Sequence, residues 1–264
     1  MEKLIIGSRG SKLALKYAEI AKKAFLKELD IEIEIKKIIT DGDLVLDRRT
    51  SEIGGKGEFI KNIEKELISK NIDVAVHSLK DVPSIKTKGL KMECFLKRND
   101  PQEVLINKAN LTLDKIKKNS VIGTSSLRRE FQLKHLRSDL NFKLIRGNID
   151  TRIKKLDEDQ YDSIILAKAG LVSLSIENRI SEVFECRKIV PPAGQGTIVL
   201  QSREDDDKIN TILSKINDNY HLGNYGCMVI YMQMSMQRAI FPIVSYTCPL
   251  KRPSKSLSNA LKRL

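Results

Sequence analysis

The chain of 264 residues carries a formal net charge of +13 at pH 7, and hydrophobic and charged residues make up 41% and 31% of it. This composition excludes a disordered chain, and the length excludes a disulfide-stapled peptide. With no apolar run of membrane-spanning length and no readable signal peptide, we expect a cytoplasmic protein that does not bind a membrane. The charge suggests an anionic partner, although abundant solvated Lys without a function would explain it equally well.

Cysteine spacing argues against two kinds of structural site. Four cysteines lie far apart in the sequence, with no C-x-x-C pair among them: Cys94, Cys186, Cys227 and Cys248. The pattern therefore predicts neither a disulfide framework nor a zinc site, and we expect no bound metal.

Strand-like and helix-like segments alternate over the first two hundred residues, which predicts sheets flanked by helices. In the first unit we expect strands at 4–6, 31–39 and 72–76, and helices at 11–27 and 59–69. Ser78, Lys80 and Asp81 follow the last of these strands, at the edge where open α/β sheets hold their ligands.

A break at residues 97–101 ends the first unit, and alternation then resumes. In the second unit we expect strands at 104–106, 120–123, 142–145 and 163–167, and a helix at 126–136. The Pro- and Gly-rich segment 189–196 suits a return to the first unit. We therefore expect two domains with a hinge, domain 1 comprising 1–97 and 190–205 and domain 2 comprising 98–189.

Arginines recur at or near the predicted strand ends. They are Arg9, Arg128, Arg129, Arg146 and Arg152. Thr124 and Ser126 open a helix in front of two of them, so backbone N–H groups, hydroxyls and guanidinium groups could converge on one carboxylate or phosphate. The pattern favours a cleft lined for several carboxylates, although a helix N-cap at Ser126 with solvated arginines is an alternative.

A candidate acid-base group lies just past the 72–76 strand. The carboxylate of Asp81 could serve a cationic intermediate or a proton transfer, with Lys80 and Ser78 tuning it. His77 competes for this role, but a single His near a strand end is more often a structural residue held by hydrogen bonds.

Five motifs follow one another in the chain: Gly54–Gly57, Val76–Pro83, Gly123–Arg129, Arg146–Asn148 and Pro192–Gly196. Together they resemble the porphobilinogen deaminase, or hydroxymethylbilane synthase, family over residues 4–203. Several long motifs in the family order make the likeness far more specific than one Gly-rich loop.

The resemblance implies a transferase of tetrapyrrole (heme) biosynthesis that joins four porphobilinogens head to tail, releases ammonia each time and frees hydroxymethylbilane. It implies an α/β fold of two periplasmic-binding-protein-like domains with a hinge, plus a small third α/β domain that is degenerate or truncated here. In the family, a Cys of that domain holds a dipyrromethane cofactor through a thioether. We expect a monomer.

The resemblance also implies roles for individual residues. Asp81 matches the catalytic Asp, which contacts pyrrole nitrogens and assists loss of the amino group through a cationic intermediate, and Lys80 is expected to act beside it. The expected substrate- and cofactor-binding residues are Arg9, Ser11, Phe59, Ser78, Thr124, Ser126, Arg128, Arg129, Arg146, Gly147, Arg152 and Gln195. Tyr17 stands where the family commonly has Gln, and Ser173 stands where it usually has another arginine.

Residues 206–264 are assigned to an atypical remnant of the third domain. Residues 219–264 contain no Asp or Glu. The stretch 242–246 resembles the one that follows the family's cofactor loop, which places the cofactor-bearing position on Ala239, with Cys248 and Cys227 as alternatives. The sequence as written therefore predicts little covalent dipyrromethane.

Two other functions remain open at this point. One is a clamshell that binds acidic pyrroles without turnover because the cofactor-bearing domain is defective. The other is a basic nucleic-acid-binding protein, which the sequence disfavours because it contains no recognition motif or basic aromatic stretch. We expect no nucleic-acid partner.

Overall fold

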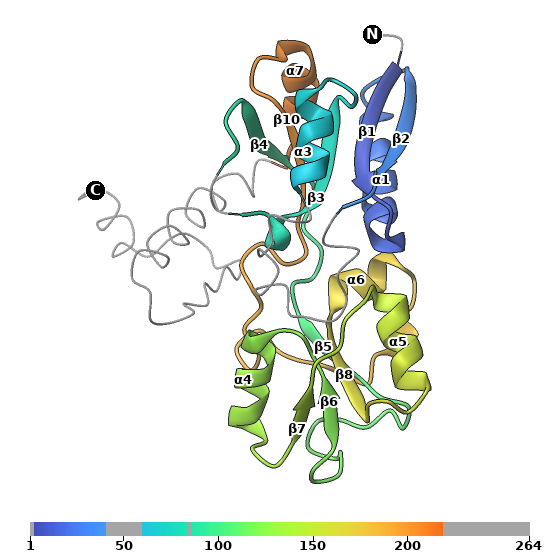
Figure 1. The fold of residues 1–264 in the computed structure, drawn as a ribbon, viewed down its shortest axis with the longest axis vertical. Helices are drawn as coiled ribbons and strands as arrows, with labels where there is room; N and C mark the ends of the chain where they lie inside the picture. Colours follow the sequence, from blue (N-terminus) through green and yellow to red (C-terminus); the bar gives the residue numbers. More distant parts are fainter. Residues whose placement is uncertain (1–2, 41–59, 84–85, 219–264) are drawn as a thin grey trace, which may run out of the picture.

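The computed structural model describes residues 3–40, 60–83 and 86–218. The expectations for Gly54–Gly57, Phe59, Cys227, Ala239 and Cys248 lie outside the described residues. The described chain forms two α/β domains stacked along the long axis of the molecule, each with its own sheet (Figure 1).

The first domain is a five-stranded sheet in the order β2-β1-β3-β10-β4. Its elements are β1 (Lys3–Arg9), α1 (Lys12–Phe25), β2 (Glu32–Ile38), α3 (Lys61–Ile68), β3 (Val74–Ser78), β4 (Leu90–Phe95), β10 (Ile198–Arg203) and α7 (Asp207–Ile216). Strands β1, β2 and β3 are parallel, whereas β10 runs antiparallel between β3 and β4. The strand that returns from the second domain thus lies inside the first sheet.

The second domain repeats this plan with the strand order β7-β6-β8-β5-β9. Its elements are β5 (Glu103–Ile106), β6 (Val121–Gly123), α4 (Leu127–Leu136), β7 (Asn141–Lys143), α5 (Ile149–Asp157), β8 (Ser163–Ala167), α6 (Lys168–Ser173), the short 3-10 helix η4 (Glu177–Arg179) and β9 (Glu182–Val183). Two similar sheets with two crossings confirm the expected periplasmic-binding-protein-like fold class.

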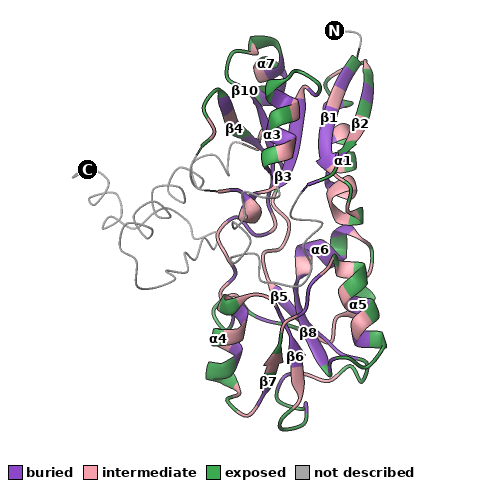
Figure 2. Ribbon diagram, in the orientation of Figure 1, coloured by how far each residue is buried: buried purple, intermediate pink, exposed green. Residues whose placement is uncertain are grey.

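Helix α1 shows why these segments fold as they do. Ser11 caps its N-terminus, accepting a 3.2 Å hydrogen bond from the backbone N–H of Ala14. Tyr17, Ala18 and Phe25 lie on one face and are buried against the first sheet. Figure 2 shows that the central strands of each sheet are buried, whereas β2, β7 and parts of the helices are exposed.

Helix α7 lies within residues 206–264 but belongs to the core of the first sheet. Its side chains Ile209, Ile212 and Leu213 pack in the same buried cluster as β1 and β10. Its N-cap, Asp206, accepts from the backbone N–H of Ile209 at 3.1 Å. This part of the segment assigned to a third domain therefore packs with the first domain.

The two crossings between the domains are hydrogen-bonded to each other. The backbone N–H of Asn99 donates to the carbonyl of Gly196 at 2.8 Å, and Arg98 Nε donates to the carbonyl of Gln195 at 3.0 Å. Gly196 has φ +85, and a Cβ there would lie 2.4 Å from the carbonyl oxygen of Asn99. Only glycine permits this close approach without strain.

None of the helices in the described ranges is long and apolar enough to span a bilayer. No group of three or more His, Cys, Asp or Glu side chains gathers there in a way that could hold a metal ion.

Candidate active site

The carboxyl end of β3 leads directly into the predicted acid-base segment. Strand β3 ends at Ser78, and the 3-10 helix η3 (Leu79–Asp81) follows at once. Lys80 and Asp81 are half-buried there. Gly194 packs over this turn with φ +75, and a Cβ would lie 2.7 Å from Cγ of Leu79. The second crossing therefore fits closely against η3, which positions both polar side chains.

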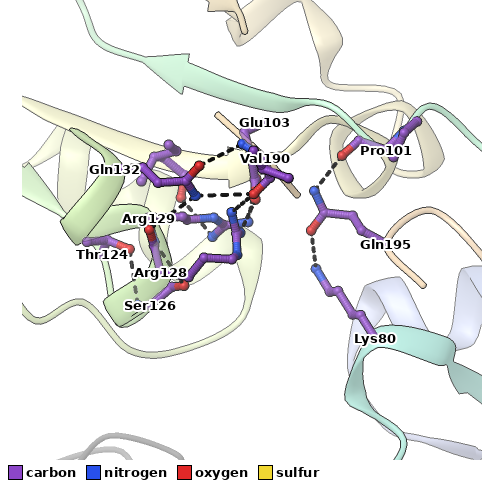
Figure 3. A network of polar contacts seen from close by, with 11 residues as sticks. Lys80, Pro101, Glu103, Thr124, Ser126, Arg128, Arg129, Gln132, Val190 and Gln195 are labelled. Carbon is purple, nitrogen blue, oxygen red and sulfur yellow. Dashed lines mark hydrogen bonds and ion pairs between the residues drawn. The ribbon is translucent and has the colours of Figure 1, made fainter. Parts of the chain in front are cut away.

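Lys80 and Gln195 connect η3 with the two crossings. Lys80 Nζ donates to Oε1 of Gln195 at 3.3 Å, and Nε2 of Gln195 donates to the carbonyl of Pro101 at 2.6 Å. Gln195 is only 1% exposed. These bonds place a predicted catalytic residue and a predicted binding residue in one network, drawn in Figure 3.

Arg128 and Arg129 lie at the start of α4 and share a buried carboxylate. Glu103 accepts from Nη2 of Arg128 through Oε1, and from Nη2 of Arg129 through Oε2 at 2.7 Å (Figure 3). Nη1 of Arg129 donates to the carbonyl of Ile165 at 3.1 Å, and Nη1 of Arg128 to that of Val190 at 2.5 Å. The two guanidinium groups are therefore held in defined positions.

The N-terminus of α4 confirms part of the local geometry expected around this pair. Ser126 is the N-cap and accepts from the backbone N–H of Arg129 at 3.4 Å. Thr124 is buried, and its hydroxyl accepts from the backbone N–H of Ser126 at 3.2 Å. Both hydroxyls thus order the turn that presents the arginines.

A second arginine group follows β7, with Arg146 in the connection to α5 and Arg152 within α5. Strand β7 ends at Lys143, so Arg146 comes three residues after a strand that was expected to run to 145. The chain leaves the sheet early because the carbonyl of Leu144 accepts from the hydroxyl of Tyr161 at 2.8 Å. Nε of Arg152 donates to the carbonyl of Gly147 at 2.8 Å, and Gly147 has φ +107, which favours glycine.

The charged groups of the two domains interact electrostatically. Burial, aided by the charges of Arg129 and Arg146, lowers the pKa of Arg152 to about 10, and Asp81 opposes the shift. Burial also lowers the pKa of Lys80, again against the charge of Asp81. Charges from both domains therefore act on one another across the site, and the cations outnumber the acids.

Buried Glu103 remains ionised in this setting. Burial raises its pKa, but the charges of Arg129 and Arg128 outweigh that effect, and the net shift is downward. The strand position explains the burial, because Glu103 pairs with Ala167 at the start of β5 and is 0% exposed.

Tyr17 and Ser173 join the site from the two domains. Burial raises the pKa of the Tyr17 phenol to about 12, the charge of Asp81 adds to this shift, and a hydrogen bond with Ser173 opposes it. The two positions at which the sequence departs from the family pattern therefore contact each other. Lys12 and Asp150 form a second bridge between the domains, with 3.1 Å between Nζ and Oδ2.

Sequence reasoning missed two members of the network. Glu103 was overlooked because it begins an apolar strand, and the one available signal was an acidic residue placed where a buried strand starts. Gln132 was overlooked because it lies mid-helix, yet it exchanges hydrogen bonds with the backbone of Val190 at 2.8 and 3.2 Å. Arg9 ends β1 in the first domain, and its charge acts on the ring of His77.

The residues fit a ligand that carries carboxylates, such as the dipyrromethane implied by the family motifs. Nε of Arg129 is buried and has no hydrogen-bond partner within the described part of the chain. A polar atom of this kind is costly to bury, and an anionic ligand would supply its partner.

Comparison with known proteins decides the family. A family model described as "Porphobilinogen deaminase, dipyromethane cofactor binding domain" matches residues 4–211. The porphobilinogen deaminase of Oceanobacillus iheyensis is 44% identical over 246 residues, covering 87% of this chain and 79% of that protein. The chain belongs to the porphobilinogen deaminase family. The enzyme of Bacillus thuringiensis is 45% identical over 220 residues, covering 83% of this chain and 71% of its own.

Solved structures of other proteins also match the chain, at low sequence identity. A periplasmic arginine-binding protein of Salmonella typhimurium is 13% identical, has a TM-score of 0.47, and is matched over 90% of this chain and 99% of its own. A putative methionine-binding lipoprotein of Bacillus subtilis is 11% identical with a TM-score of 0.48, over 85% and 93% of the two chains.

Proposed function

We propose that the polar groups between the two domains form the site at which this chain carries out its family's reaction. The chain is a transferase of tetrapyrrole biosynthesis that polymerises four porphobilinogens to hydroxymethylbilane with release of ammonia. The observation that carries the site assignment is the electrostatic group formed by Asp81, Arg129, Arg146 and Arg152. The charges of one carboxylate and of two other guanidinium groups act on Arg152 there. Such a mixture of charges suits a substrate with acidic side chains and a cationic reaction centre.

The arginines supply the binding energy for carboxylates. Their guanidinium groups offer two-point hydrogen bonds that Lys cannot match, and partial burial strengthens each charge-assisted bond. We assign this role to Arg9, Arg128, Arg129, Arg146 and Arg152, with Thr124, Ser126 and Gly147 shaping the backbone around them. We also assign ligand contacts to Ser11, the N-cap of α1, and to Ser78, the last residue of β3. Phe59 remains a proposed contact outside the described residues.

Asp81 carries the negative charge for the chemical step. Loss of the substrate's amino group leaves positive charge on the pyrrole, and a fixed carboxylate stabilises that charge without having to reorganise. Lys80 lies beside it with a pKa lowered by burial, so this ammonium group releases a proton more readily than an exposed lysine does. Gln195 holds Nζ of Lys80 in place.

Dipyrromethane is the family's cofactor, and when bound it supplies the pyrrole end to which the chain is extended. The arginines listed above are the residues that would hold its carboxylates. The family's attachment position falls on Ala239, which offers no thiol, so Cys248 and Cys227 are the alternatives for a thioether. All three lie outside the described residues.

The division into domains is part of the same proposal. We infer a first domain of 1–97 and 190–205, a second of 98–189, and a remnant third domain from 206 onward whose first helix packs on the first sheet. We further propose a cytoplasmic monomer whose partner is porphobilinogen, with neither nucleic acid nor membrane as a partner.

Turnover of porphobilinogen by the purified chain tests the proposal. We expect the rate at which porphobilinogen is consumed and hydroxymethylbilane formed to follow the small fraction of the chain that carries covalent dipyrromethane. At equal cofactor content, Asp81→Asn should lose about 10²-fold in rate, the usual cost of removing one preorganised electrostatic group. Asp205→Asn is the matched control, because Asp205 is exposed on the loop before α7. Equal rates in Asp81→Asn and the parent would overturn the assignment of Asp81.

A further inference from the structure

Glu103 is the most deeply buried carboxylate of the described chain, and it binds both arginines at the start of α4. Its side chain is 0% exposed, against 16% for Arg128 and 9% for Arg129. Each carboxylate oxygen takes one guanidinium group. A buried carboxylate is tolerated only when it is paired in this way, so the three side chains form one unit.

The charges within this unit leave a net charge of one. Two guanidinium groups and one carboxylate sum to +1, and Glu103 stays ionised because its partners lower its pKa. The unit therefore matches a single ligand carboxylate. Without Glu103, two adjacent cations would repel each other in a half-buried site.

The same unit is attached to both crossings. Glu103 comes two residues after Pro101, whose carbonyl accepts from Gln195. Arg128 donates to the carbonyl of Val190 on the other crossing, where Gln132 also binds. Through these contacts the guanidinium groups have a fixed orientation relative to the hinge and to Lys80.

We propose that Glu103 is the positioning residue of a subsite for one carboxylate, holding Arg128 and Arg129 in place and neutralising one of their two charges. This inference rests on the proposed function for the identity of the ligand, porphobilinogen. Glu103 does not touch the ligand. It acts through the arginines, and its removal allows their side chains to move.

Substitution of Glu103 can be compared with that of another buried carboxylate. Glu103→Gln keeps the size and removes the charge, and Glu103→Asp keeps the charge but shortens the reach. Glu64→Gln is the matched control, because Glu64 is 9% exposed and bonds the neutral side chains of Gln201 at 2.7 Å and Thr87 at 2.8 Å.

Arginine side-chain NMR tests, without any ligand, whether Glu103 holds Arg128 and Arg129 in place. Guanidinium groups that are held in this way rotate slowly and give resolved Nη signals. The signals that disappear in Arg128→Leu and in Arg129→Leu identify those of the two arginines. We expect these signals in the parent and in Glu64→Gln and their loss in Glu103→Gln. Signals that persist in Glu103→Gln would refute the positioning role of Glu103.

Calorimetric titration with porphobilinogen tests the consequence for binding. We expect about tenfold weaker binding in Glu103→Gln, an intermediate value in Glu103→Asp and little change in Glu64→Gln. Equal or tighter binding in Glu103→Gln would overturn the positioning role. If the parent binds no porphobilinogen, the proposed function fails, whereas the NMR result still decides whether Glu103 positions the two arginines.

Discussion

Nζ of Lys80 lies 3.3 Å from Oε1 of Gln195, which joins the turn after β3 to the second interdomain crossing. The same Gln195 side chain donates to Pro101 on the first crossing. One buried amide therefore links a proposed catalytic residue to both segments about which the two domains would rotate.

Gln195→Ala should destabilise the protein. The substitution removes the two hydrogen bonds that the buried Gln195 side chain makes with the carbonyl of Pro101 and with Nζ of Lys80, which costs about 1–3 kcal/mol of unfolding free energy. Urea unfolding of both proteins measures the difference. Gln160→Ala is the control, because Gln160 is exposed and its side-chain amide donates to the exposed side chain of Glu158. An unchanged midpoint for Gln195→Ala would contradict the predicted loss.

Arg128→Leu should weaken porphobilinogen binding by about tenfold or more, since a charge-assisted bond to a ligand carboxylate is worth about 1.5–3 kcal/mol. The dissociation constant, measured by calorimetry, reports the change. Arg187→Leu removes an arginine whose side chain is 83% exposed and should bind as the parent does. If both variants lose affinity equally, only the overall charge matters, and the subsite is refuted.

Acid should destabilise the protein through His77. Burial lowers the pKa of this imidazole in the folded state, although the hydrogen bond with Gln201 opposes the shift. The unfolded chain, with a histidine pKa of about 6.5, binds the proton that the folded chain excludes. The free energy of unfolding therefore falls as the pH drops below that value, by at most about 1.4 kcal/mol per pH unit for one proton.

Urea unfolding between pH 5 and 8, a range set by the unperturbed histidine pKa of about 6.5, measures this dependence. In His77→Gln the decline toward acid pH should be shallower. His135→Gln, which changes an exposed histidine, should keep the slope of the parent. The same slope in His77→Gln and the parent would show that another group is responsible.

The intact mass of the purified protein tests cofactor attachment. Because the family position falls on Ala239, we expect the mass of the unmodified chain. Cys94 offers no alternative, since burial raises the pKa of its thiol to about 12 and keeps it protonated. An adduct that disappears in Cys227→Ser or Cys248→Ser, but not in Cys94→Ser, would contradict this expectation and identify the anchoring residue.

Much of the fold could be predicted because its signals are local. Apolar periodicity predicted α1 and β3 to within two residues at the ends, and Ser126 marked a helix start by its cap chemistry. Strand β7 was placed less well, because its end depends on a hydrogen bond from Tyr161, which is distant in sequence. Boundaries set by such contacts leave no local pattern.

The features of the site were likewise predictable from the sequence only in part. The sequence by itself determined that arginines, Lys80 and Asp81 follow strand ends, because strand and turn signals lie within a few neighbouring residues. Only the tertiary structure decided that Glu103 holds Arg128 and Arg129, and that Gln195 holds Lys80. These partners are separated by 25, 26 and 115 residues. Glu103 meets the two arginines only when the second domain packs, and Gln195 meets Lys80 only once the chain has crossed back to the first domain.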